Sequence, residues 1–170
     1  MKETAPMSLD PLLEADLAIR IHAFSAIAAF AIGGFVLWRR KGTTLHKALG
    51  RLWVVLMLVV ATSSLFINEI RLVGPFSPIH IFAVMTYLGI GQALWAIRVK
   101  RDVAAHRANM QGTYLGALLL AGAFTFLPGR RMHDVLFGPD AGWTPSLIVI
   151  GAALAATGLL WRRLMPRAAD

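Results

Sequence analysis

Five apolar stretches in the sequence reach or approach the length needed to cross the hydrocarbon core of a bilayer. That core is about 30 Å thick, and a helix needs about 20 residues to span it. Lipid offers no partner to open backbone groups, so such stretches are expected to be helices. The fold class expected is an all-α integral membrane protein, a bundle of five transmembrane helices in one domain over residues 1–170. The predicted spans are 17–38, 52–70, 79–97, 110–127 and 143–161.

The composition excludes the main soluble classes. Hydrophobic residues make up 57% of the chain and charged residues 15%, against ~45–50% and ~25% in soluble domains. There is no cysteine, which excludes disulfides, iron–sulfur clusters and thiol nucleophiles. The phosphate loop, the dinucleotide-binding glycine pattern and the HExxH zinc signature are missing from the sequence as well. No catalytic constellation is visible, so whether the protein is an enzyme stays open.

The net charge of +8 comes from basic residues that gather in alternate loops. Positive loops stay in the cytoplasm, so the first and third loops and the C-terminus are expected inside and the acidic N-terminus outside. These loops are expected to bind anionic lipid headgroups rather than nucleic acid. Their basic residues are Arg39, Arg40, Lys41, Lys47 and Arg51 in the first loop, Arg98, Lys100, Arg101 and Arg107 in the third, and Arg162, Arg163 and Arg167 in the tail.

Reporter fusions test this orientation directly. A fusion after Gly42 and another after Ala105 are expected to report from the cytoplasm, and one after Pro75 is not, because only the first two positions lie in basic loops. A periplasmic signal after Gly42 would overturn the orientation.

The histidines are the main candidates for polar chemistry inside the bundle, where polar groups are costly. His22 and His80 lie near the starts of the first and third spans, and His46 and His106 precede the second and fourth. Because the spans alternate in direction, His22 and His80 are expected at the outer face and His46 and His106 at the inner face. His133 follows the fourth span on the outer side.

Helical spacing predicts that the outer histidines face the interior of the bundle. His80 shares its face with Tyr87, which lies deeper than the interface where tyrosine normally sits. His22 shares its face with small residues, a pattern that lets transmembrane helices pack closely. That series is Ser25, Ala29 and Gly33.

Histidine pairs on two helices are typical of haem b sites, because neutral imidazoles can supply both axial ligands. The interpretation is one haem held by His22 and His80 and a second held by His46 and His106, together carrying electrons across the bilayer. Each histidine would donate its other ring N–H to a carbonyl, a carboxylate or water. Arginines near the faces could bind the propionates. These are Arg20, Arg51 and Arg71.

Other interpretations of these residues stay open. The histidines could be interfacial groups that bind lipid phosphates, carbonyls or neighbouring side chains, or His22, His80 and His133 could surround a copper or zinc ion. The alternative function is a non-enzymatic accessory or scaffold subunit of a larger membrane complex, with small residues serving contacts to other subunits. A transporter is disfavoured, because no Asp or Glu lies deep within a span. A quinone is a further candidate partner.

Four short motifs, in order, resemble those of an uncharacterised family of bacterial membrane proteins. Residues 42–51 resemble its GTxxHxxLGR signature, 76–80 its FSxxH, 106–110 its HRxxM and 127–130 its LPGR segment. The chain thus resembles domain-of-unknown-function family 2306 (DUF2306), which implies a multi-pass protein of the bacterial inner membrane and no assigned activity. The histidine pattern also resembles, in outline, transmembrane cytochromes b that exchange electrons with ascorbate, quinol or ferric acceptors, although those usually have six helices.

Overall fold

The computed structural model describes residues 8–67 and 78–164, and these are helices joined by short loops. Four helices are long and apolar enough to cross a membrane, and the number rises to five if Val103–Phe126 and Arg131–Phe137, bent by 67°, form one span. The all-helical, multi-span class is therefore confirmed, while the orientation stays a prediction. The elements are α1 (Asp10–Leu13), α2 (Leu17–Trp38), α3 (Thr44–Ser64), α4 (Pro78–Trp95), η1 (Ala96–Lys100), α5 (Val103–Thr113), η2 (Tyr114–Leu120), α6 (Ala121–Ala123), η3 (Phe124–Phe126), α7 (Arg131–Phe137) and α8 (Thr144–Leu164).

Two helices begin earlier than the apolar pattern indicates. Helix α2 has the predicted bounds, but α3 begins at Thr44 rather than at residue 52, and α5 at Val103 rather than at residue 110. The reason is capping, which starts a helix before its apolar face begins. The Thr43 hydroxyl accepts a hydrogen bond from the His46 N–H at 3.1 Å, and the Asp102 carboxylate accepts one from the Ala105 N–H at 2.9 Å.

This corrects the placement of two candidate residues. His46 and His106 were expected just before the second and fourth spans, and both lie inside the first turns of α3 and α5. The aligned side chains of a helical turn, rather than a loose loop, therefore position them.

The fourth span contains a wide turn. Helix α5 continues into η2, a seven-residue π-helix. Helix α6 and the 3-10 turn η3 follow without a break and complete this helical segment. A π-helix closes its hydrogen bonds one residue later than an α-helix and rarely runs beyond a single turn. Tyr114, Leu115 and Leu118 of η2 are buried, so the wide turn directs this apolar group toward neighbouring helices.

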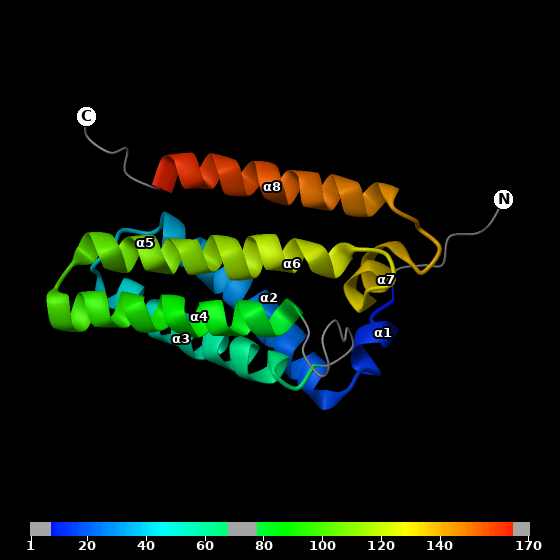
Figure 1. Cartoon of the computed structure of the whole chain (residues 1–170), viewed down its shortest axis with the longest axis horizontal. Coiled ribbons are helices and arrows are strands. Elements are labelled where there is room, and N and C mark those ends of the chain that lie inside the picture. Colours follow the sequence, from blue (N-terminus) through cyan, green and yellow to red (C-terminus); the bar gives the residue numbers. More distant parts are fainter. Residues whose placement is uncertain (1–7, 68–77, 165–170) are drawn as a thin grey trace. The chain divides into compact units, whose positions relative to one another are not determined.

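Contacts group the chain into two compact units, and each is described by itself. Unit 2 is Leu17–Leu118, and unit 1 is Met1–Asp16 with Leu119–Asp170. In unit 2, α2 packs on α3, α3 on α4 and α4 on α5 (Figure 1). The ring of helices closes at Tyr114, whose hydroxyl donates to the Phe30 carbonyl at 3.2 Å while the two rings stack at 5.9 Å.

The core of unit 2 is closed around Gly33. The Trp53 indole N–H donates to the Ala29 carbonyl at 3.0 Å, and Ala29 is completely buried. A Cβ at Gly33 would overlap the Trp53 nitrogen and lie 2.7 Å from ring carbons of Tyr114. The expectation that Ala29 and Gly33 face a helix contact is therefore confirmed, because only a residue without a side chain admits both rings.

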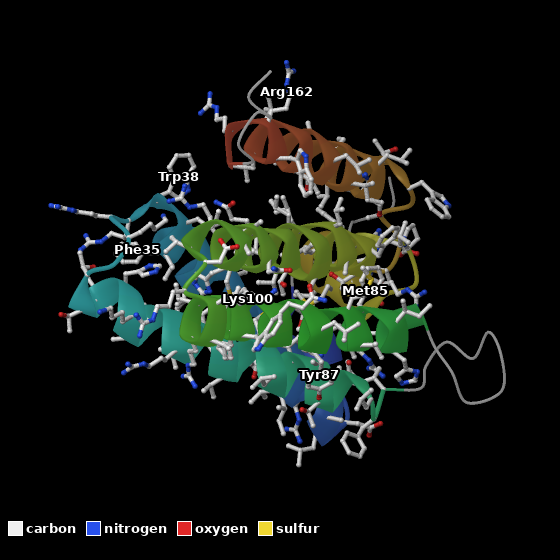
Figure 2. The ribbon with its side chains drawn as sticks, turned by 60° about the vertical axis from the view of Figure 1, so that its left-hand side comes forward. Phe35, Trp38, Met85, Tyr87, Lys100 and Arg162 are labelled. Carbon is white, nitrogen blue, oxygen red and sulfur yellow. The ribbon has the colours of Figure 1, made fainter. Side chains whose placement is uncertain are left out.

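The outer surface of unit 2 is apolar, as expected of helices in contact with lipid. Trp38 is 74% exposed and Met85 62%, and both are seen with Phe35 in Figure 2. The Lys100 ammonium lies 4.2 Å from the centre of the exposed Trp95 ring, a pairing of an aromatic and a cation that suits a membrane interface. The bilayer is therefore a partner of these helices.

Unit 1 contains α1, α7 and α8. Helix α1 packs on α7, and the Arg131 guanidinium donates to the Pro11 carbonyl at 3.3 Å. At the start of α8, the completely buried Ser146 hydroxyl donates to the Phe126 carbonyl. These contacts fix α7, η3 and the start of α8 to one another.

Candidate functional site

His22 ties two helices of unit 2 together. It projects from α2, and its Nδ1 donates to the Val60 carbonyl of α3 at 3.0 Å. A carbonyl can only accept, so the proton of the neutral ring lies on Nδ1 and the lone pair on Nε2.

His106 has the same arrangement on another pair of helices. Its Nδ1 lies 2.9 Å from the Ala93 carbonyl of α4 and donates to it. A carbonyl partner at one nitrogen is what orients metal-binding histidines, because it fixes the tautomer and leaves the other nitrogen basic. His22 and His106 therefore each form, through Nδ1, the kind of hydrogen bond that orients an iron-binding histidine.

His46 lies at the same end of unit 2 as His106. Both sit in the first turns of helices that run in the same direction, and His46 lies within electrostatic range of His106 and of Lys41. Its Nδ1 is buried and, among the residues that the structure describes, has no hydrogen-bond partner. The structure thus places His46 and His106 at one end of unit 2 and leaves one ring nitrogen of His46 unsatisfied.

Two cations, Lys41 and Arg107, form a positive cluster near His46: Lys41 lies within electrostatic range of His46 and of Arg107. Lys41 donates to three carbonyls at the C-terminal end of α2, those of Val36 at 3.1 Å and Leu37 at 2.5 Å in its last turn and that of Arg39 at 2.9 Å just after it. Burial lowers the pKa of Lys41, and repulsion from Arg107 lowers this pKa further. Within the described ranges, no carboxylate forms an ion pair with Lys41 or Arg107. The cluster would therefore be stabilised by an external anion.

The predicted outer pair lies at one end of unit 2. His22 binds the Val60 carbonyl near the end of α3. The hydroxyl of Tyr87 of α4 lies 2.8 Å from that of Thr62 of α3, and His80 precedes Tyr87 by seven residues toward the same end. A common ligand for His22 and His80 stays a prediction.

The arginines expected to bind propionates are spread over the chain. Arg20 lies in α2, and its Nε is buried without a hydrogen-bond partner among the described residues. Arg51 is exposed on α3. Arg71 lies outside the described residues, as do the first two residues of the 76–80 motif.

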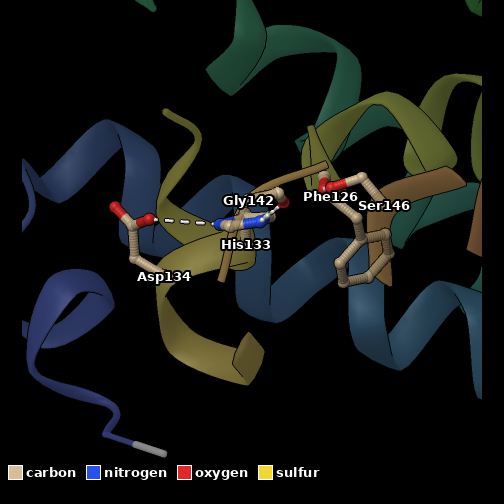
Figure 3. A network of polar contacts seen from close by, with 5 residues as sticks. All are labelled: Phe126, His133, Asp134, Gly142 and Ser146. Carbon is tan, nitrogen blue, oxygen red and sulfur yellow. Dashed lines mark hydrogen bonds and ion pairs between the residues drawn. The ribbon is translucent and has the colours of Figure 1, made fainter. Parts of the chain in front are cut away.

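His133, which the sequence places after the fourth span, is a completely buried residue of α7. Its Nε2 lies 3.1 Å from the Gly142 carbonyl and its Nδ1 3.4 Å from Asp134 Oδ1 (Figure 3). Both ring nitrogens thus have partners within unit 1. In residues 8–67 and 78–164, no three metal-binding side chains are close enough to hold an ion, so the copper or zinc interpretation gains no support.

Helical spacing does not predict this buried histidine, because its Gly142 partner lies nine residues away in a connecting loop. The one related feature of the sequence is the glycine at position 142. In the structure Gly142 has a positive φ of 67°, a conformation that other residues rarely adopt.

Comparison with known proteins identifies one family. The model of the family described as "Predicted membrane protein (DUF2306)" matches residues 19–157. This range includes all four motifs that carried the resemblance, and the match confirms it. No curated protein and no solved structure matches the chain.

Proposed function

We propose that this chain, which belongs to the DUF2306 family of predicted membrane proteins, is an electron carrier of the bacterial inner membrane that binds haem b through His46 and His106. That it is a multi-span membrane protein follows from its helices. The observation that carries the finer proposal is the inner pair itself: two histidines in the first turns of α3 and α5 at one end of unit 2, one oriented by a carbonyl and one with an unsatisfied ring nitrogen.

The donor set fits a haem. His106 keeps a basic Nε2 because its Nδ1 donates to the Ala93 carbonyl. The buried Nδ1 of His46 has no partner among the described residues, and leaving such a group unsatisfied costs about 1–3 kcal/mol. A bound group with a metal and acceptor oxygens would offset that cost.

The positive charges near His46 are suited to the propionates of a haem. The carboxylates of haem propionates form strong hydrogen bonds with cationic side chains, and Lys41 and Arg107 are cations without a carboxylate partner in the described ranges. When bound, haem b supplies one-electron transfer, with a potential set by its ligands and surroundings. The side chains of this chain would orient the group and neutralise its propionates.

A second haem between His22 and His80 stays a prediction. Both residues lie at the other end of unit 2, on α2 and α4, and contacts of both helices reach the end of α3.

An accessory subunit is the second candidate function. His22 and His106 each join two helices through a backbone carbonyl, and this contact alone is a sufficient structural reason for a histidine inside a membrane bundle. In that case the protein would hold no cofactor and would act through its contacts with other subunits.

The absorption spectrum of the purified protein separates the two functions. Protein from a haem-sufficient host, reduced with dithionite, is expected to show a sharp α-band, and extraction is expected to yield haem in proportion to protein. Protein that carries neither visible absorbance nor stoichiometric metal would overturn the proposal and favour the accessory subunit.

A further inference from the structure

An open groove of about 380 Å³ runs between α4 and α5 in unit 2. Its volume is within the range of ~300–1,000 Å³ that small-molecule sites occupy. Most of its lining is apolar or small, with Phe82 and Met85 among the residues of α4 and Gly112 on α5. None of the histidines lines it, so the haem proposal does not use it.

Two amide side chains in this groove have unused hydrogen-bonding capacity. The hydroxyls of Thr86 and Thr113 donate to carbonyls of their own helices at 2.7 and 2.8 Å. The Asn109 amide nitrogen likewise donates to Ala105 at 2.9 Å, and its oxygen remains available. Gln92 is exposed, and in the described part of the chain its amide forms no hydrogen bond. The groove therefore offers a donor and two acceptors.

Gln92 lies well inside an apolar span. In the span Ile79–Lys100, Gln92 is eight residues from the nearer end, or about 12 Å. In a core about 30 Å thick, water does not reach this depth and an unpaired amide is costly. A lipid acyl chain could fill the groove but has no group that would bond the amides.

The lining leaves room for a flat ring. Gly112 and Gly116 lie along the α5 and η2 side of the groove, and a Cβ at either would meet no atom within 4 Å. Glycine thus leaves open space beside the two amides, while Phe82 and Met85 provide apolar surface further along the groove.

We propose that this groove binds the head ring of an isoprenoid quinone from the membrane. Such a molecule is lipid-soluble and planar, and its two ring oxygens accept hydrogen bonds as a quinone and also donate them as a quinol. Gln92 can donate to a ring oxygen or accept from it, and Asn109 can accept. The apolar chain would follow the apolar part of the groove into the bilayer.

The groove lies next to the proposed haem ligands. Gln92 precedes Ala93, whose carbonyl holds His106, and Asn109 follows His106 by one helical turn. Quinone binding itself does not depend on haem, whereas a role of the quinone as redox partner rests on the proposed function.

The test is a titration of the purified full chain, in lipid nanodiscs, with decylubiquinone. Trp95 lies one turn from Gln92 and is 52% exposed, so quenching of tryptophan fluorescence follows binding whether or not haem is present. Wild-type protein is expected to give saturable quenching. Gly112→Leu, which fills the groove, is expected to abolish saturation, and Gln92→Leu to weaken binding about two- to tenfold.

Gly91→Leu is the matched control. Gly91 is also a helical glycine with no atom within 4 Å of an added Cβ, but it does not line the groove, so its leucine variant is expected to bind like the wild type. Equal binding by the Gly112→Leu and Gly91→Leu variants would overturn the proposal. So would non-saturable quenching of the wild type together with a Gly112→Leu variant that releases a copurifying subunit, because the groove would then hold a partner helix.

Discussion

Gly33→Leu is expected to prevent the helices of unit 2 from closing. Even a Cβ at this position would overlap Trp53 and lie 2.7 Å from the Tyr114 ring. Neither ring can move freely, since each is anchored to α2 by a hydrogen bond, to Ala29 at 3.0 Å and to Phe30 at 3.2 Å. Overpacking together with the loss of these bonds is expected to lower the free energy of unfolding by on the order of 3 kcal/mol or more.

Thermal unfolding of the purified variants measures this effect. Gly33→Ala is expected to be destabilised in the same direction and by less, because only one methyl group must be accommodated. Gly91→Leu controls for the loss of a glycine from a membrane helix, since an added Cβ there meets nothing within 4 Å. If Gly33→Leu unfolded at the same temperature as Gly91→Leu, the three-residue contact at Gly33 would be contradicted.

Loss of either inner histidine is expected to abolish the reduced α-band. A haem b iron with one remaining axial histidine loses its low-spin spectrum and is held weakly, so His46→Ala and His106→Ala should both purify with little or no sharp absorbance. The reduced spectrum and the haem content of each variant check this result.

His22→Ala is the matched control for structural damage. It removes a histidine-to-carbonyl bond of 3.0 Å between two helices, just as His106→Ala removes one of 2.9 Å, but at the other end of unit 2. It is expected to keep the inner-site band. Added imidazole is expected to restore the band in His106→Ala, because it replaces the ligand. Equal loss of absorbance in all three variants, without rescue, would show that the histidines act only through packing.

The spans were predictable from the sequence because lipid leaves an apolar segment of this length only one conformation. For α2, the apolar run correctly predicted both the first and the last residue of the helix. The starts of α3 and α5 were missed, because Thr43 and Asp102 extend these helices through a polar first turn. Capping residues were present in the sequence, but the apolar pattern alone does not register them.

The site was predictable only to the level of which end of the bundle each histidine occupies. Alternation of the spans places His46 and His106 at one end and His22 and His80 at the other. Depth depends on how helices slide along one another, and the contact of Tyr87 with Thr62 sets this register. No periodicity within one helix contains that information, so the relative depth of two histidines on different helices could not be foreseen from the sequence.

The wide turn of η2 gives the chain a place where its length can change during evolution. Because a π-helix holds an extra residue within its turn, deleting one from Tyr114–Leu120 lets the backbone become α-helical while the flanking segments keep their facing directions. The same deletion in the middle of α3 would rotate the rest of that helix by about 100° and turn His46 or the Val60 carbonyl away from its neighbours. In an alignment of family members, single-residue gaps are therefore expected to occur in η2 and to be missing from the middle of α3.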